Sequence, residues 1–164
     1  MLTVLIVCEA DPGPLVPTFA SLVGASVAGL IADVLVAHPT PDRIAALCEP
    51  TGAQPVATEG VAVALGETRG EWVLVLEAGA RPDGDWIPLV AAHVGGDRRS
   101  ARFEVAGAGE PFWRRLIGRA HRPLRAGFLI ERRQAINALR TTSPARLPVG
   151  RAAVTLRARL LPAS

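Results

Sequence analysis

The stretch WVLVLEAGARPDGDW, residues 72–86, decides the fold. It begins with the apolar run Trp72–Leu76, which is typical of a strand buried on both faces. One carboxylate, Glu77, follows the run, and a loop rich in glycine and aspartate comes next. Asp85–Val94 then predicts a helix, with Pro88 in the first turn, where no backbone hydrogen bond is lost. A buried strand that leads through an acidic loop into a helix is a unit of parallel α/β sheets.

Further strands and helices alternate upstream of this stretch. Leu2–Val7 and Asp33–Ala37 are short apolar runs that predict buried strands, and Gln54–Ala57 predicts an edge strand, where Pro55 is tolerated. Helices are expected at Leu15–Val23, from the N-cap Thr40 to about Cys48, and at Gly60–Glu67. This alternation predicts a mostly parallel sheet with right-handed crossovers, in which ligands bind at the carboxyl ends of the strands.

The pattern changes after Gly96. Ala101–Ala106 alternates apolar and polar residues, as an antiparallel or edge strand does. Gly127–Ile130 predicts a short strand and Glu131–Arg140 a helix, while Ala152–Leu161 fits either a helix or a strand. We find no internal repeat and no long flexible linker, so we expect residues 1–164 to form a single domain.

The charges of the chain are divided unevenly between its two ends. Residues 1–97 carry a net charge of −9 and residues 98–164 a net charge of +12, which together give the overall +3. All 18 basic residues are arginine. The division predicts either an anionic partner for the second half or attraction between the two halves.

The cysteines and the N-terminus indicate a cytoplasmic protein. Cys8 and Cys48 are the only cysteines, and no CxxC motif or Cys/His cluster accompanies them, which argues against a disulfide or zinc scaffold. The N-terminus enters a strand-like run without the basic region of a cleavable signal. Leu15–Ala32 lacks charge for 18 residues, but its proline and glycines favour a buried helix and loop over a membrane span.

The order of these parts resembles the nucleotide-sugar half of family-2 glycosyltransferases with the GT-A fold. In that family three strands end in polar loops, the third in an Asp-x-Asp motif, and the matching places here are Val4–Asp11, Val36–Asp42 and Val73–Pro82. The resemblance implies a three-layer, Rossmann-like α/β core with a mostly parallel sheet. The resemblance covers the first 94 residues. Together with the division of charge it gives an acidic nucleotide-sugar half, residues 1–97, and an arginine-rich half, residues 98–164.

The resemblance also implies a ligand and a set of residues that contact it. A nucleotide-diphosphate sugar would lie against Cys8, Glu9, His38, Glu77 and Gly79, and Glu77 would be a ligand for Mg²⁺ or Mn²⁺. The chain departs from the family pattern because Glu77 remains as one carboxylate where the family has two. Other interpretations stay open: Glu77 as a solvated strand end, His38 as a turn residue, and Cys8 as a buried apolar residue.

A catalytic base is harder to identify. Inverting members of the family carry a carboxylate near a later helix, positioned to take the proton of the acceptor hydroxyl. Glu131, just after the second-half strand, is the candidate for this role. The competing interpretation is that Glu131 pairs with the two arginines that follow it.

The arginine-dense stretch 110–127 is the second candidate site. An apolar side with flanking arginines is typical of a helix in a lipid headgroup layer, and it suits family members that act on lipid-linked acceptors. The alternative is a core helix whose arginines pair with the acidic half. Nucleic acid is an unlikely partner, because no recognition motif accompanies the charge. The residues assigned to an anionic membrane or protein partner are Trp113, Arg114, Arg115, Arg119, Arg122 and Arg125.

Two functions remain from the sequence. The first is a divergent glycosyltransferase-like protein that binds, or descends from binders of, a nucleotide-diphosphate sugar, with transfer to a membrane-associated acceptor at the inner membrane. The second is a catalytically inactive pseudo-glycosyltransferase that serves as a binding or scaffold module for a membrane or protein partner. The missing second carboxylate keeps both open.

Overall fold

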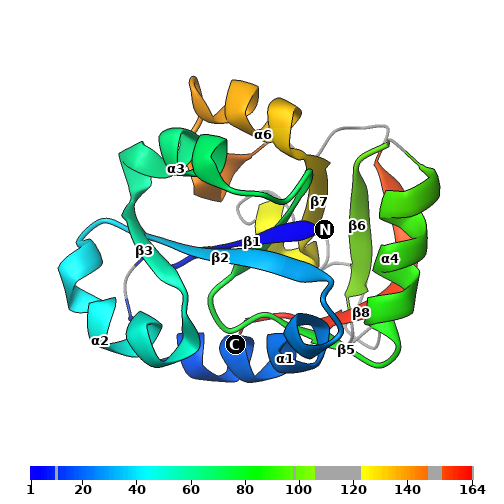
Figure 1. The fold of residues 1–164 in the computed structure, drawn as a ribbon, viewed down its shortest axis with the longest axis horizontal. Helices are drawn as coiled ribbons and strands as arrows, with labels where there is room; N and C mark the ends of the chain where they lie inside the picture. Colours follow the sequence, from blue (N-terminus) through cyan, green and yellow to red (C-terminus); the bar gives the residue numbers. More distant parts are fainter. Residues whose placement is uncertain (10, 98, 106–122, 148–152, 164) are drawn as a thin grey trace, which may run out of the picture.

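One eight-stranded sheet runs through the molecule (Figure 1). The computed structural model describes residues 1–9, 11–97, 99–105, 123–147 and 153–163. The strand order is β3-β2-β1-β4-β7-β6-β8-β5. The strands are β1 (Leu2–Val7), β2 (Ile31–His38), β3 (Gln54–Ala57), β4 (Trp72–Glu77), β5 (Arg81–Asp83), β6 (Ala101–Val105), β7 (Phe128–Glu131) and β8 (Val154–Leu161).

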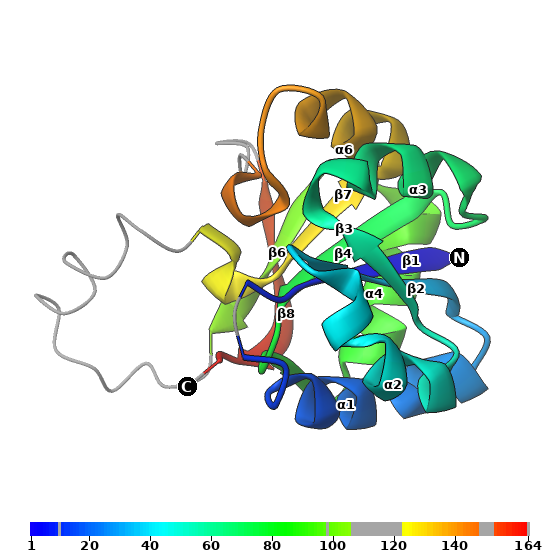
Figure 2. The same cartoon turned by 90° about the vertical axis from the view of Figure 1, so that its left-hand side faces the viewer.

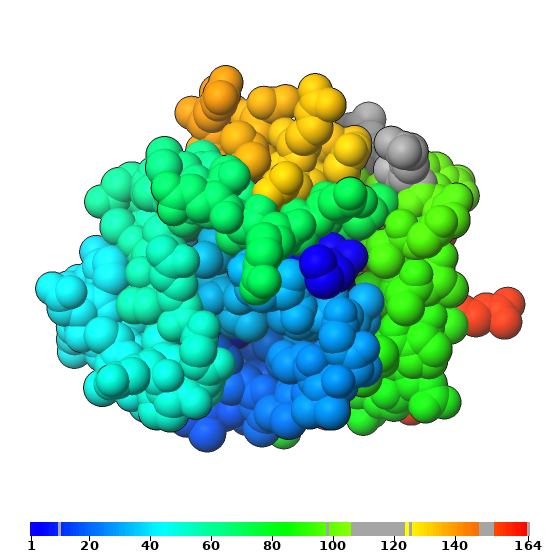
Figure 3. All heavy atoms as spheres, in the orientation of Figure 1, coloured from blue at the N-terminus to red at the C-terminus, as the bar shows by residue number. Residues whose placement is uncertain are grey.

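Helices cover both faces of this sheet and give three layers. Helices α1, α2 and α4 pack on one face, and α3 and α6 pack on the other (Figures 1 and 2). The space-filling view shows α3 and α6 at the top of the molecule and α1 at its lower rim (Figure 3). The described helices are α1 (Leu15–Val27), α2 (Ala45–Cys48), α3 (Val61–Glu67), α4 (Trp86–Gly96) and α6 (Arg132–Leu139).

The parallel part of the sheet is its centre. All six residues of β1 are buried, which explains their uninterrupted apolar sequence. Strand β1 pairs in parallel with β2 on one side and with β4 on the other. Four of the seven strand pairings among the described residues are parallel. The predicted fold class, an α/β core in three layers with a mostly parallel sheet, is confirmed.

The two halves of the chain contribute to the same sheet. Strand β7 pairs antiparallel with β4, and β8 pairs with both β6 and β5. Gly127, just before β7, has φ +59°, and a Cβ there would lie 3.2 Å from side-chain carbons of Leu76 and Leu160. A glycine is therefore needed where the second half meets the core.

Three local expectations change. The segment that fitted either helix or strand is the strand β8, because it finds partners on both sides. Arg81–Asp83, expected as part of a turn, is the short strand β5 at the edge of the sheet, where Pro82 is tolerated. The helix expected from Thr40 to about Cys48 begins instead as a 3₁₀ turn, Pro41–Arg43, and the short α2 follows it. Thr40 is at the predicted N-cap position, but its side chain makes no capping hydrogen bond.

No helix in the described part of the chain is both long enough and apolar enough to cross a bilayer. Helix α1, the core of the uncharged stretch, has 13 residues and ends before Gly29, which has φ +71°. At about 1.5 Å per residue α1 spans about 20 Å, well short of a hydrocarbon core of about 30 Å.

Candidate functional site

The loops after β1, β2 and β4 meet at one edge of the sheet. Val7 is in register with Ala37 of β2 and with Glu77 of β4. The amide of Cys8 donates to the carbonyl of Ala37 at 2.9 Å, and the amide of Ala78 donates to the carbonyl of Val7 at 2.9 Å. Because these strands are parallel, their carboxyl ends form the edge at which α/β proteins bind ligands.

Cys8 and Glu9 follow β1 at this edge and differ in their exposure to solvent. Glu9 is exposed, whereas Cys8 is 2% exposed and packs in the same core cluster as Cys48. The Cys8 thiol donates to the carbonyl of Asp11 at 3.4 Å. Burial raises the pKa of the Cys48 thiol, and the nearby Cys8 adds to this effect. Both cysteines therefore contribute apolar volume to the core.

His38 ends β2 and shapes the loop that follows. Its side chain is 3% exposed, and Nδ1 lies 2.9 Å from both the amide nitrogen and the carbonyl oxygen of Thr40. When Nδ1 accepts from the Thr40 amide, the ring proton is on Nε2. The ring therefore supports the loop, and its contact with a nucleotide stays a prediction.

Glu77 ends β4 on the opposite side of the sheet from His38. The alternation of a strand places Glu77 on the same face as Val73 and Val75, which pack with α3 and α6. His38 follows Val36, which packs with α1 and α2. The Glu77 side chain is half-buried. Glu77 and His38, both predicted to contact the nucleotide, thus lie at the same end of the strands but on opposite faces of the sheet.

Gly79 is held by α1. Its amide donates to Thr18 Oγ1 at 2.8 Å, and the Thr18 hydroxyl donates to the carbonyl of Pro14 at 3.3 Å. Gly79 has φ +96°, and a Cβ there would lie 3.1 Å from Ala163 Cβ and 3.2 Å from Pro14 Cβ. The loop after β4 is therefore fixed between the start of α1 and the segment after β8.

The acidic side chains near this edge limit how a metal ion could be held. Within the described ranges, no group of three or more His, Cys, Asp or Glu side chains lies close enough to hold a metal. Asp83 belongs to β5, which pairs with β8, and Asp85 begins α4. Glu77 supplies one carboxylate, and Mg²⁺ is commonly bound by one or two carboxylates together with substrate phosphates and water. Among the described residues, the side chains near this edge do not by themselves form a metal site.

Glu131 lies at the opposite end of the strands, where β4 begins. It pairs with Trp72, the first residue of β4, whereas Glu77 is the last. Five residues of strand separate these positions by about 16 Å. A general base must be within hydrogen-bond reach of its proton, so Glu131 cannot act on a hydroxyl bound near Glu77. Its carboxylate accepts a hydrogen bond from Gln134 Nε2 at 3.3 Å.

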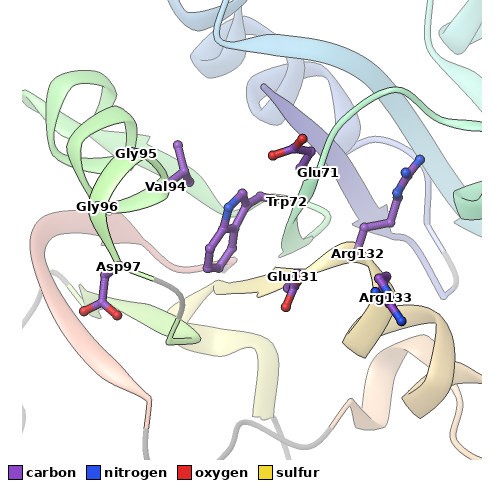
Figure 4. Close-up of a pocket in the computed structure, with 9 residues that line it drawn as sticks. All are labelled: Glu71, Trp72, Val94, Gly95, Gly96, Asp97, Glu131, Arg132 and Arg133. Carbon is purple, nitrogen blue, oxygen red and sulfur yellow. The ribbon is translucent and has the colours of Figure 1, made fainter.

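A pocket of about 390 Å³ surrounds Glu131 at this amino edge (Figure 4). The indole of Trp72 stands between the end of α4 and the start of α6 (Figure 4). The Arg132 guanidinium donates to the carbonyl of Thr68. Hydrogen bonds from Arg99 hold the pKa of Asp97 far below its usual range. The pocket is lined by Glu71, Trp72, Val94, Gly95, Gly96, Asp97, Glu131, Arg132 and Arg133.

The candidate membrane or anionic-partner residues are not tested by the structure. Trp113, Arg114, Arg115, Arg119 and Arg122 lie outside the described residues. The backbone of Arg125 belongs to a 3₁₀ turn, Pro123–Ala126, but its side chain is also outside the described part.

Sequence reasoning missed Thr18 and the amino-edge pocket. Thr18 is fully buried in a helix without charges, and a lone hydroxyl on a buried helix face is a signal that could have indicated a structural hydrogen bond. The pocket has no comparable local signal, because its residues come from segments that only the strand pairing brings together.

Comparisons with known proteins identify the fold. No family model matches the sequence, and no curated protein matches it. Mannosyl-3-phosphoglycerate synthase from Rubrobacter xylanophilus is structurally similar at a TM-score of 0.56 and 16% identity, over 82% of this chain and 54% of that one. Glucosyl-3-phosphoglycerate synthase from Mycobacterium tuberculosis, in complex with Mn²⁺, UDP and phosphoglyceric acid, gives 0.54 and 17%, over 80% and 56%.

Another structure of the M. tuberculosis glucosyl-3-phosphoglycerate synthase is similar at a TM-score of 0.58 and 16% identity, over 99% of this chain and 72% of that one. The chain spans little more than half the length of the first two structures. At these identities the likeness concerns the fold. The chain has the Rossmann-like GT-A fold that these nucleotide-sugar glycosyltransferases share.

Proposed function

We propose that the protein binds a nucleotide-diphosphate sugar at the carboxyl edge of β1, β2 and β4. The loops that hold Cys8, Glu9, His38, Glu77 and Gly79 would surround the ligand. The observation that carries the proposal is the parallel register that brings these loops together in a GT-A fold. A structural neighbour of the same fold is known in complex with Mn²⁺ and UDP-glucose.

The backbone of the β4 loop indicates how the diphosphate would be neutralised. The amides of Ala78, Gly79 and Ala80 donate to the carbonyl of Val7, the hydroxyl of Thr18 and the carbonyl of Glu77. These three amides are therefore already used within the protein and do not form an anion-binding nest. These amides are not available to neutralise the diphosphate, so we propose that binding depends on Mg²⁺ or Mn²⁺.

Glu77 is the proposed protein ligand of that ion. Hard carboxylate oxygens suit both cations, and Glu77 is half-buried at the strand end. When bound, the ion would supply charge stabilisation to a departing nucleoside diphosphate. In this scheme β4 orients the Glu77 carboxylate. The hydrogen bond between Gly79 and Thr18 fixes the loop that follows.

Two outcomes follow for the sugar. In the first, an acceptor hydroxyl attacks the anomeric carbon, the bond from that carbon to the nucleoside diphosphate breaks, and the hydroxyl proton passes to water or to the departing diphosphate. In the second, the protein binds the nucleotide sugar without transfer and acts as a pseudo-glycosyltransferase module. The position of Glu131 at the opposite edge favours the second, because it removes the candidate base from the ligand edge.

Titration calorimetry with a panel of UDP- and GDP-sugars, with and without Mn²⁺, tests the proposal. We expect binding with Mn²⁺ and a loss of about tenfold or more in Glu77→Gln. Glu71→Gln is the matched control, because it changes a carboxylate beside the other end of β4. The absence of binding at millimolar ligand would reject the proposal, and equal binding without Mn²⁺ would reject the role of the ion. Release of UDP or GDP in the presence of acceptors then separates transfer from binding alone.

The sequence also supports a membrane-associated acceptor. We propose that the arginine-dense stretch 110–127 contacts anionic lipid, with Trp113 and its neighbouring arginines at the headgroups. Co-sedimentation with vesicles that contain phosphatidylglycerol should show binding that salt weakens. Indifference to anionic lipid and to salt would reject the membrane proposal without affecting the nucleotide-sugar proposal.

A further inference from the structure

The indole of Trp72 carries an unused hydrogen-bond donor in the amino-edge pocket. Trp72 is 6% exposed and lines this pocket. Its Nε1–H makes no hydrogen bond with the part of the chain that the structure describes. The nitrogen is also not sealed off, because Thr3 Oγ1 is the one fully enclosed side-chain atom without a partner among the described residues. Since buried donors are normally paired, the pocket offers a position for an acceptor atom of a ligand.

A histidine of α4 fixes the orientation of this indole. The ring of His93 meets the Trp72 ring edge-on, with ring centroids 5.7 Å apart and an angle of 69° between the planes. His93 Nε2 donates in turn to the carbonyl of Arg99 at 2.8 Å. The His93 side chain is itself buried. The donor of Trp72 is therefore held in position without a ligand.

Two carboxylates lie beside the indole. Glu131 is directly opposite Trp72 in the antiparallel pairing of β7 with β4, so both side chains leave the same face of the sheet. One oxygen of Glu131 accepts from Gln134, and the Glu71 side chain makes no hydrogen bond or ion pair with the described residues. Figure 4 shows both carboxylates on the same side of the indole. Both can therefore accept hydrogen bonds from a ligand in the pocket.

The other charged side chains of the pocket are engaged or directed elsewhere. Asp97 accepts a hydrogen bond from Arg99 Nη2 at 2.7 Å. The Arg132 guanidinium donates to a backbone carbonyl of the loop before β4. In Figure 4 the side chains of Arg132 and Arg133 extend away from the indole. The charge that remains beside the indole is therefore negative.

Helix α4 ends at the same pocket. Its last two residues, Gly95 and Gly96, line the pocket and have no side chain to cover their backbone. The final carbonyl groups of a helix lack partners within the helix and form the negative end of its dipole, which favours a cation. The helix end and the two carboxylates therefore attract the same kind of ligand.

We propose that the amino-edge pocket binds a small organic cation, an amine that also carries hydroxyl or carbonyl oxygens. The ammonium group would donate to Glu71 and Glu131, in charge-assisted hydrogen bonds. An oxygen of the same molecule would accept from Trp72 Nε1. The pocket volume of about 390 Å³ is in the usual range for small-molecule sites, roughly 300–1,000 Å³. The same charges disfavour a nucleoside diphosphate, so this site is separate from the proposed nucleotide-sugar site.

Glucosamine and glucose are matched probes, because they differ by an ammonium group in place of one hydroxyl. An assigned proton–nitrogen correlation spectrum of the full chain, at about pH 6 where the amine is protonated, reports the binding of each. We expect glucosamine to shift the Trp72 indole resonance and the amides of Gly95 and Gly96. The dissociation constant should be on the order of 1 mM. Glucose at the same concentration should shift none of these resonances.

Replacement of Glu131 by glutamine tests the carboxylate. Glu131→Gln should weaken glucosamine binding about tenfold, because the amide keeps the shape of the side chain and loses its charge. Glu49→Gln is the matched control, since Glu49 is an exposed carboxylate in the turn after α2. Neither side chain is buried, so circular dichroism should report an unchanged fold for both variants.

Four results would overturn the proposal. The first two are a Trp72 indole resonance that glucosamine does not shift, and equal shifts with glucose. The third is equal weakening by Glu49→Gln and Glu131→Gln. The fourth is a set of glucosamine shifts confined to residues 7–11, 37–40 and 77–80, which would place the amine at the carboxyl ends of β1, β2 and β4. The nucleotide-sugar proposal is tested separately, because neither probe carries a phosphate.

Discussion

The hydroxyl of Thr18 accepts a hydrogen bond from the amide of Gly79 at 2.8 Å. This bond joins the first turns of α1 to the loop after β4, 61 residues further along the chain. Thr18 also donates to the carbonyl of Pro14, so its hydroxyl serves both segments. The shape of the proposed ligand edge therefore depends on a fully buried threonine of α1.

Replacement of Thr18 by valine should destabilise the protein more than replacement by serine. Valine keeps the volume but removes the acceptor, which leaves the partly buried Gly79 amide without its partner and costs about 1–3 kcal/mol. Serine keeps the hydroxyl and loses one methyl group, at about 0.8 kcal/mol. Urea unfolding of the two variants measures the difference. Equal stabilities of Thr18→Val and Thr18→Ser would show that the hydrogen bond contributes nothing.

Gly79→Ala and Gly84→Ala should differ, although both glycines have positive φ. A Cβ at Gly84 meets nothing within 4 Å, so alanine there costs only the backbone strain of about 1 kcal/mol. A Cβ at Gly79 also crowds Ala163 and Pro14, which raises the cost to about 2 kcal/mol or more. In thermal unfolding, Gly79→Ala should have a lower melting temperature than Gly84→Ala. The reverse order would contradict the packing of residue 163 against this loop.

Gly70→Ala and Gly66→Ala should have opposite signs. A Cβ at Gly70 would lie 2.3 Å from the backbone nitrogen of Thr3, which would force the central strand β1 to move and costs about 3 kcal/mol. Gly66 is in α3 with nothing within 4 Å, so alanine there stabilises the helix by roughly 0.5 kcal/mol. Chemical denaturation checks both. A neutral Gly70→Ala would mean that β1 and the segment before β4 are not in this close contact.

The cysteines should resist thiol reagents in the folded protein. Cys8 and Cys48 are buried, and burial raises the pKa of Cys48, so little thiolate forms near pH 8. Because the folded protein holds this proton more tightly than the unfolded chain, stability should fall as pH rises above about 8.5. Ellman's reagent at pH 8 should label both thiols only after unfolding. Rapid labelling of the native protein would place a thiol at the surface.

The central strands could be read from the sequence because each is defined locally. Leu2–Val7 and Trp72–Leu76 are continuous apolar runs, and burial on both faces allows little else. The positions of Glu77 and Gly79 at the carboxyl end of β4 could be read for the same reason, because both come directly after its apolar residues. The GT-A order of parts thus depends on features that single segments carry.

What the sequence left open depends on pairing between distant segments. Strand β5 exists because Arg81–Asp83 meets Leu161 and its neighbours, and no local pattern indicates such a partner. The position of Glu131 likewise follows from its register with Trp72, which puts it at the opposite end of β4 from Glu77. Chemistry that depends on two segments was therefore harder to predict than the strands themselves.

The proposed position of the nucleotide, at the carboxyl ends of β1, β2 and β4, can be tested directly. Hydrogen–deuterium exchange of the full chain, with and without UDP-glucose and Mn²⁺, compares the two edges of the sheet in one experiment. We predict that the ligand slows exchange in residues 7–11, 37–40 and 77–80 and leaves residues 94–97 and 131–133 unchanged. Protection confined to residues 94–97 and 131–133 would put the ligand in the amino-edge pocket and contradict the account.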